Sequence, residues 1–393
     1  SRGLGDVYKR QGNYNLWYGV CCLETGEPAE ALKHLESAVK RRVPSGQLYL
    51  ARAYNDLYRF EEAIETYETY ISDLRKRKRS TEEAEQLLEK SKSNLRMLKG
   101  VEEVCFIDSF VVDKEKFLDA YKISPESGKL FMYDTYFNDS GKEGGTVYET
   151  ELGNKLYYSE MQPDSTLSIL SRNKLLDKWS DGSLLPGSIN EAMNADYPYV
   201  LTDGITIYYA SDGPGSMGGY DIFVTRYNTN TDSYLMPENV GMPFNSPYND
   251  YMMVFDEVKG LGWFVSDRFQ PEGKACVYLF IPNPEHKRVE SEDIEMKRTR
   301  AAITSIRDSW KEGSDYTDLI RLSHTEIPYG EEKIEKDFEF IIAGNIVYYK
   351  LDEINSPEAK SYYEKVVALN KQIKELNEKL DGLRTSYVNC LLY

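Results

Sequence analysis

A spacing that occurs twice in the middle of the chain constrains its fold more than any other feature. Two sets of three residues share intervals of 11 and then 21 positions: Trp179, Asn190 and Ser211, and Tyr234, Asn245 and Ser266. The offset between the sets is 55 residues. A repeated three-point spacing is hard to obtain by chance, and such periods indicate one supersecondary unit that stacks on copies of itself.

Short aromatic segments within these repeats are typical of β-strands. "LYYSE" (156–160), "IYYAS" (207–211) and "GWFVS" (262–266) are the same element met three times, and their aromatic content and alternation favour strands. The middle repeat contains four such segments, "YPYV", "ITIYYAS", "YDIFVTRYN" and a looser "SYLMPENVG". Four antiparallel strands in roughly 40–55 residues, repeated radially, predict propeller blades. We therefore predict an antiparallel, β-propeller-like domain over 104–288.

A glycine run separates two of these strands in "YYASDGPGSMGGYDIFVTRYN" (208–228). We interpret it as a hairpin loop in which Gly213, Gly215, Gly218 and Gly219 supply positive φ and room for the turn. Asp221 is expected to brace that turn through backbone amides. A phosphate loop would need Gly-Lys-Ser/Thr before a helix, and here a strand comes next. Calcium bound through Asp212 and Asp221 remains an alternative, although the spacing is not that of an EF-hand.

The sequence around this loop resembles the WD-like propeller repeats of TolB-type proteins, in the version found beside tetratricopeptide repeats in envelope proteins of Bacteroidetes. The matching positions are Asp203, Gly204, Ser211, Gly218, Gly219, Tyr220, Asp221, Ile222, Pro237, Asn239, Gly241 and Asn245. Only this repeat is complete. The repeat at 146–190 lacks the Gly-Gly-aromatic-Asp motif, the one at 250–282 has no fourth strand, and 117–137 reads as a partial blade. Strands within 338–349 could close the ring.

A second repeat, of helical type, precedes the strands. Four residues recur as residues of similar role 32 positions later: Gly19, Ala31, Leu35 and Ala38 as Ala51, Ala63, Tyr67 and Tyr70. Small side chains at such positions let antiparallel helices approach closely. "GEPAEALKHLESAV" and "YRFEEAIETYETYI" resemble second helices of tetratricopeptide repeats, although Asn15 and Tyr70 depart from that pattern. The resemblance covers about 60 residues and implies a face that binds peptides or proteins.

We predict that the helical repeat spans 13–99, with Tyr54 and Tyr67 on its partner surface. Ser80 and Glu83 fit a capping box for a third helix that runs to about Leu98. Residues 1–12 show no clear relation to the helical repeat after them and are expected to be an artefact or disordered.

The region 289–393 is predicted to be helical, with a strand pair at 338–349 and a heptad helix at 357–388. An a/d seam runs through Val366, Leu369, Ile373, Leu376, Leu380 and Leu383. Packing within the chain is the first interpretation of this seam, and a helix-mediated dimer is the alternative. The overall fold class is thus multidomain α plus β.

Composition argues against several classes of function. The formal net charge of -17 disfavours nucleic acid and anionic lipid as partners. No stretch approaches eighteen apolar residues, so no direct membrane span is expected. The five cysteines are scattered, without a disulfide framework or a zinc motif, and the three histidines lie far apart. No Gly-x-Ser-x-Gly elbow occurs. We therefore expect no cofactor, no metal and no enzymatic activity.

The resulting hypothesis is a protein-interaction scaffold, which the resemblance assigns to the periplasm or the outer membrane. One alternative is a glycan-binding propeller whose surface tyrosines Tyr220, Tyr227 and Tyr248 stack on sugars. A less favoured alternative is a glycoside hydrolase that uses two turn carboxylates. The candidates for such a pair are Asp203, Asp212, Asp221 and Asp250.

Overall fold

The computed structural model describes residues 2–138, 141–175, 178–190 and 193–325, with 340–343, 346–348 and isolated positions between 356 and 379. The chain divides into two compact units, Ser1–Ile327 and Pro328–Tyr393. This boundary lies later than the predicted one at 288/289. The reason is that α8 (Ile294–Ala302) packs on the helices of the first unit, and α9 (Thr317–Ser323) packs on its strands.

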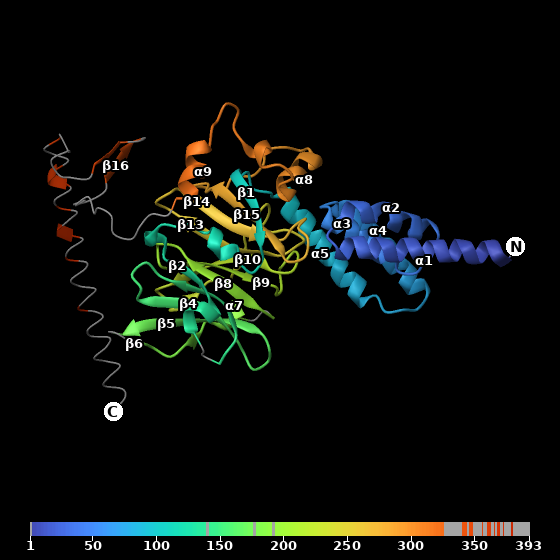
Figure 1. The fold of residues 1–393 in the computed structure, drawn as a ribbon, viewed down its shortest axis with the longest axis horizontal. Coiled ribbons are helices and arrows are strands. Elements are labelled where there is room, and N and C mark those ends of the chain that lie inside the picture. Colours follow the sequence, from blue (N-terminus) through green and yellow to red (C-terminus); the bar gives the residue numbers. More distant parts are fainter. Residues whose placement is uncertain are drawn as a thin grey trace. The chain divides into compact units, whose positions relative to one another are not determined.

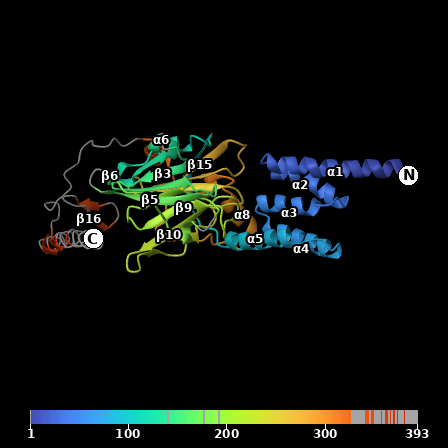
Figure 2. The same ribbon diagram turned by 90° about the horizontal axis from the view of Figure 1, so that it is seen from below.

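The first unit begins with a helical arm of five helices that lie side by side (Figure 2). They are α1 (Arg2–Glu24), α2 (Pro28–Lys40), α3 (Gly46–Asp56), α4 (Phe60–Lys76) and α5 (Glu82–Lys99). The small residues of the 32-residue repeat are the points of closest approach. A Cβ at Gly19 would lie 2.6 Å from Leu35 Cγ, and Ala31 and Ala63 are fully buried. Helices with small residues at the crossing point can pack this closely.

Two expectations about the arm are wrong. Helix α1 starts at Arg2, so residues 2–12 are helical and not disordered, whereas the other expectation, that this segment is an artefact, stays a prediction. Helix α5 begins at Glu82 with Thr81 as its N-cap, and no side chain caps it. The capping box of Ser80 and Glu83 therefore does not form, because the helix starts too late for Ser80 to reach its first turn. Acidic residues in that turn suit the helix dipole instead.

The sheet domain comes after the arm, with three antiparallel sheets built from residues 105–281. The first has the order β2-β3-β4-β5-β6, with β7 beside β5. Its strands are β2 (Lys129–Met132), β3 (Gly144–Glu149), β4 (Lys155–Met161), β5 (Leu167–Leu175), β6 (Lys178–Trp179) and β7 (Ser183–Leu184). The short α7 (Gly187–Asn190) leads to the second sheet.

The second sheet has the order β11-β10-β9-β8, with β12 also paired to β10. Its strands are β8 (Ala195–Val200), β9 (Thr206–Ser211), β10 (Asp221–Asn228), β11 (Ser233–Tyr234) and β12 (Glu238–Asn239). The predicted four-strand unit is thus confirmed, with the looser last segment split into two short strands. The three aromatic segments of the sequence are strands β4, β9 and, in the third sheet, β14 (Leu261–Ser266).

The third sheet, which contains β13 (Asp250–Asp256), β14 and β15 (Lys274–Ile281), takes its fourth strand from far away in the sequence. Strand β1 (Cys105–Asp113) pairs antiparallel with β15, in the order β1-β15-β14-β13 (Figure 1). The expectation that the segment 250–282 has no fourth strand of its own is confirmed, and β1 completes the sheet instead. A strand's partner depends on tertiary structure, and no local pattern reveals it.

The partial blade expected at 117–137 does not exist. That segment holds η1 (Phe117–Ala120), η2 (Pro125–Ser127), the edge strand β2 and α6 (Tyr133–Phe137). It connects two sheets: the Tyr121 hydroxyl donates to the Met252 carbonyl of the third sheet at 2.6 Å, and the Tyr148 hydroxyl of the first sheet donates to the Ser127 carbonyl at 3.3 Å.

The three sheets are stacked in chain order around one core. Strand β8 packs on β3, β4 and β5, and β13 packs on β8, β9 and β10. The buried cluster includes Tyr148, Ile169, Tyr199, Tyr209, Val254 and Val277, which come from all three sheets. The equivalent strands β3, β8 and β13 each have a register shift, at Gly144/Val147, Asp196/Tyr199 and Tyr251/Val254. Among the described strands, no pairing joins one sheet to another.

The second unit contains β16 (Phe340–Ala343) and β17 (Ile346–Tyr348), which confirm the predicted strand pair. They pair with each other, and the idea that they close the ring of sheets stays a prediction. Leu369 is in a helical position and 57% exposed. The other seam residues, Val366, Ile373, Leu376, Leu380 and Leu383, lie outside the described residues, so the heptad seam stays a prediction.

Candidate interaction groove

The 55-residue repeat is explained by an asparagine that hydrogen-bonds to the backbone of β5 in the first sheet and of β10 in the second. The Asn245 side chain accepts from Ile222 N at 2.7 Å and donates to Ile222 O at 2.8 Å. Asn190 does the same to Ile169, at 2.8 and 3.0 Å. Both amides thus satisfy both polar groups of one backbone residue. The repeated asparagines are therefore structural residues. Each lies in the connection from one sheet to the next and holds that connection against a strand of the earlier sheet.

A second pair of equivalent contacts was not apparent from the sequence. The Asn194 backbone and side-chain amides both donate to Asp212, at 2.7 Å each. Asn249 donates to Asp267 in the same way, at 2.9 and 2.8 Å. Asn249 Oδ1 also accepts from Tyr220 N at 3.0 Å. Asn194 Oδ1 likewise accepts from Leu167 N at 3.0 Å, so each asparagine joins its own sheet to the preceding one. The 55-residue offset between the two sets was the signal that could have revealed them.

The glycine loop is braced by Asp221, as predicted. Its carboxylate accepts from Met217 N at 2.8 Å, Gly218 N at 3.2 Å and the Asn239 amide at 2.7 Å. Asn239 Oδ1 in turn accepts from the Asn245 amide at 2.8 Å. The motif residues therefore form one hydrogen-bonded network, which fixes the loop on the second sheet.

The glycines of this loop act differently from the prediction. Of the four, only Gly215 has a positive φ, at 92°. Gly218 and Gly219 are needed for close approach: an added Cβ would lie 2.1 Å from Tyr248 O and 2.1 Å from Asn249 Oδ1, respectively. The loop is therefore pressed against residues 247–249, and only glycine fits there.

The four carboxylates that were candidates for a hydrolase site all make hydrogen bonds or ion pairs within the fold. Asp203 accepts from Ile205 N and Thr206 N at the β8–β9 turn, where Gly204 has a φ of 70°. Asp212 is held by the amides of Asn194, and Asp221 is held by the loop amides that it braces. Asp250 is fully buried and pairs with Arg268 at 2.6 Å. Among the described residues, no group of three or more histidine, cysteine or acidic side chains could hold a metal ion.

Asp221 should make the stability of the protein depend on pH. Burial raises the pKa of Asp221 to about 7, and the negative charge of the nearby Asp250 is the second cause of this rise. The folded state binds this proton more tightly than the unfolded state does. Protonated Asp221 therefore adds to the free energy of unfolding in full below about pH 4, and this stabilisation is lost as pH rises through 7. Its size is on the order of 4 kcal/mol. Urea unfolding from pH 4 to 8 should show a flatter profile for Asp221→Asn than for the wild type, and two parallel profiles would contradict this assignment.

The tyrosines proposed as contact residues pack against neighbouring side chains. Tyr67 is buried in the arm, at 2% exposed, and the other four are half-buried. Tyr220 packs on Tyr197, Tyr227 on Tyr234 and Tyr248 on Phe269. Tyr54 lies under the Arg59 guanidinium. The sugar-stacking alternative expected exposed and clustered rings, and this arrangement does not favour it.

An exposed aromatic strip that the sequence analysis did not identify lies on α1. Tyr14, Trp17 and Tyr18 are 62%, 61% and 41% exposed. Their spacing of three and four residues is the signal that could have shown them on one helix face.

The arm is joined to the sheet domain by direct contacts. The Lys90 ammonium donates to Gly218 O at 2.8 Å, and Arg298 of α8 donates to Tyr58 O at 3.1 Å. Tyr58 is fully buried, together with Met217 and Met242, in a cluster shared by both parts. The glycine loop therefore contacts α5 directly, through the hydrogen bond from Lys90.

An open groove of about 410 Å³ lies beside this contact, and we call it the interdomain groove. The arm contributes Leu48, Tyr49, Arg52, Asn55, Asp56, Tyr67, Glu83, Leu87, Lys90 and Ser91, and the sheet domain contributes Met217, Gly218 and Pro247. Both polar and apolar groups line it. Residues 48–56, 83–91 and 217–247 come together only in the folded unit, so no sequence motif marks the groove.

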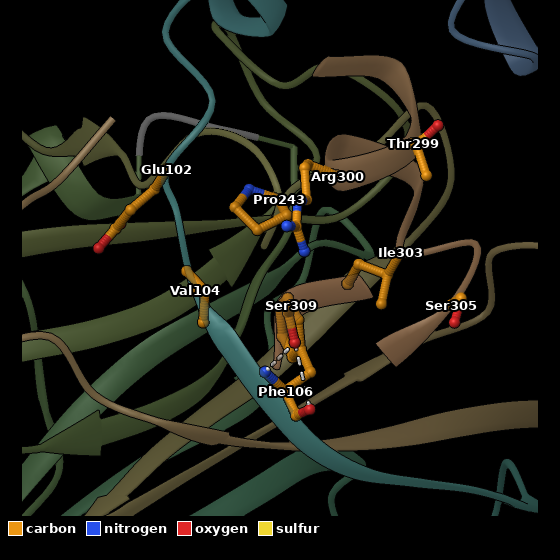
Figure 3. Close-up of a pocket in the computed structure, with 9 residues that line it drawn as sticks. All are labelled: Glu102, Val104, Phe106, Pro243, Thr299, Arg300, Ile303, Ser305 and Ser309. Atoms are coloured by element: carbon orange, nitrogen blue, oxygen red, sulfur yellow. Dashed lines mark hydrogen bonds between the residues drawn. The ribbon is translucent and has the colours of Figure 1, made fainter. Parts of the chain in front are cut away.

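A smaller pocket lies where the chain enters β1, against α8. Figure 3 shows it between Val104, Ile303 and Arg300, with Ser309 hydrogen-bonded to Phe106. Its volume is about 10 Å³, which is room for one water molecule. This pocket is too small for a ligand. Another cleft, of about 390 Å³, is lined by the arm alone, including Val39, Tyr70 and Arg77. We take the interdomain groove as the candidate site because both the arm and the sheet domain line it.

Within the described residues, every helix is too short or too polar to span a membrane. Comparisons of the chain with protein-family models, with curated proteins and with solved structures found no match.

Proposed function

We propose that this protein is a non-enzymatic scaffold of the bacterial cell envelope that binds partner proteins in its interdomain groove. The observation that carries the proposal is the groove itself, which is open, about 410 Å³ in volume and walled by two domains. Grooves of mixed polarity beside helical repeats suit extended peptide segments. No cofactor enters this proposal.

We interpret the arm as two tetratricopeptide-like units and the additional helix α5, and the three sheets as blades of a TolB-type, propeller-like domain. The equivalent clamps of Asn190 and Asn245 support the repeat on which the resemblance rests. The pairing of β1 with β15 supports it too, because a strand from the start of the domain covers the edge of its last sheet. The envelope location is carried by the resemblance of the motif from Asp203 to Asn245.

The test is affinity capture from the bacterial envelope with the tagged full-length chain and identification of the captured proteins by mass spectrometry. We expect a stoichiometric protein partner for the wild type and a loss of most of it for Arg52→Ala with Glu83→Ala, which removes two charged side chains of the groove. The matched control is Asp318→Ala with Arg321→Ala on α9. It also removes one acid and one base, and it should keep the partner.

Capture that is equal for the groove variant and the wild type would move the partner site elsewhere, with the aromatic strip of α1 as the next surface to change. Retention by purified cell-wall glycans, without any enriched protein, would favour the glycan-binding alternative and overturn the scaffold proposal.

A further inference from the structure

The interdomain groove contains a carboxylate with weak polar compensation. The Asp56 side chain lines the groove, and 17% of it is exposed. Its charged neighbour within 4 Å is Arg52, whose Nε lies 4.0 Å from Asp56 Oδ2. Burial raises the pKa of Asp56 to about 6, even though Arg52 and, less strongly, Asn55 act to lower it. A half-buried carboxylate with one distant cation is poorly compensated for the hydration that it has lost.

The two cations of the groove are committed to other partners. Arg52 Nη1 lies 2.7 Å from Glu24 Oε1, and Lys90 Nζ donates to Gly218 O at 2.8 Å. Arg52 therefore reaches Asp56 only through Nε at 4.0 Å, and Lys90 forms no ion pair with it among the described residues. A second acid, Glu83, is exposed on the opposite helix of the groove and takes part in no ion pair among the described residues.

The walls of the groove suit a positive group on an alkyl stem. Tyr49 lies on its arm side and is half-buried, and aromatic faces attract cations. Leu48 and Leu87 offer apolar surface to methylene groups. An anionic ligand would be repelled by Asp56 and Glu83, because Arg52 and Lys90 already bind other groups.

We propose that the interdomain groove accepts a lysine or arginine side chain from an extended segment of the partner protein, with Asp56 as its counter-ion. The inference rests on the proposed function, since it names the chemistry that the groove selects. The net charge of -17 adds a long-range attraction for a basic partner. A charged hydrogen bond to Asp56 would also compensate its lost hydration.

The experiment uses three peptides with acetylated and amidated ends: Gly-Ser-Arg-Ser-Gly, the same peptide with citrulline in place of arginine, and the same with glutamate. Binding to the full-length chain is measured by isothermal titration calorimetry at low ionic strength and pH 7.5. We expect the arginine peptide to bind about tenfold or more tightly than the citrulline peptide, and the glutamate peptide to bind weakest.

The diagnostic variant is Asp56→Asn, which keeps the size of the side chain and removes the charge. It should lose the preference for arginine over citrulline, whereas the exposed control Asp318→Asn should retain it. A wild-type measurement at pH 5 gives the same readout without any substitution, because protonation of Asp56 should reduce the preference. Glu24, Glu83, Arg52 and Lys90 are the other charged groups near the site, and a Glu83→Gln variant isolates the share of Glu83.

Three results would each overturn the inference. The arginine and citrulline peptides could bind equally, or Asp56→Asn could keep the preference for arginine. The arginine peptide could also show no measurable binding at millimolar concentration. These outcomes are distinct from failure of the scaffold proposal. If the groove variant still loses a captured partner while the arginine preference is absent, the groove binds a protein through other chemistry.

Discussion

Replacing Arg268 with methionine is expected to destabilise the protein by about 3–5 kcal/mol. Arg268 and Asp250 are both fully buried, and their ion pair is 2.6 Å long. The substitution would leave the Asp250 carboxylate buried without its counter-ion. Burial already raises the pKa of Asp250, and Arg268 is the group that opposes this rise most strongly.

The guanidinium also holds three segments together. Its remaining N–H groups donate to Ser266 Oγ at 2.8 Å, to the carbonyls of Pro243 and Phe244 at 2.9 and 2.7 Å, and to Ala301 O at 3.1 Å. Each of its five donors thus has an acceptor. Loss of Arg268 would therefore loosen α8 and the entry to the third sheet together.

Urea unfolding at pH 7 measures this effect. The control is Arg321→Met, whose exposed pair with Asp318 should contribute less than about 1 kcal/mol. The double variant Arg268→Met with Asp250→Asn should recover part of the loss, because the uncompensated charge is gone. A loss below about 1 kcal/mol for Arg268→Met alone would show that the pair does not carry the stability assigned to it.

The second large effect is expected from Asn245→Ala, at about 3 kcal/mol. Asn245 is fully buried, and its amide bonds both Ile222 N and Ile222 O. Alanine would leave both backbone groups without this partner and would also release Asn239. Asn190→Ala removes the same clamp from a more exposed position and should cost about 2 kcal/mol.

Thermal and urea unfolding of both variants would test whether the two asparagines are equivalent. Asn230→Ala, in an exposed turn, is the control and should change stability by less than about 0.5 kcal/mol. Asn245→Asp should be at least as harmful as alanine, because a carboxylate would face the Ile222 carbonyl. A neutral result for Asn245→Ala, with a large loss for Asn190→Ala, would contradict the repeat as the explanation for the spacing.

Much of the local structure could be predicted from the sequence. Aromatic alternation identified β4, β9 and β14, and small residues in a helical period identified the packing of α1, α2 and α4. The role of Asp221 could be inferred from its position after a glycine run and before a strand. These features depend on neighbours within a few residues, which a local pattern records.

The candidate site could not be predicted in that way. Asp56, Lys90 and Gly218 lie in three different segments, and none of them belongs to a motif that suggests a groove. The tyrosines that the sequence did suggest are half-buried or buried, because large aromatic rings serve the core at least as often as a surface. A sequence pattern gives the chemistry of a side chain but not its exposure.

The sequence by itself determined that a helical arm precedes repeated units of antiparallel strands, and it contains the 55-residue repeat that the asparagine contacts explain. Tertiary structure alone decided that β1 pairs with the distant β15 to complete the third sheet and that α5 rests on the glycine loop. The physical reason is that periodicity specifies which face of an element is apolar. The identity of the distant surface that buries that face, and any groove left beside it, depends on how the whole unit packs.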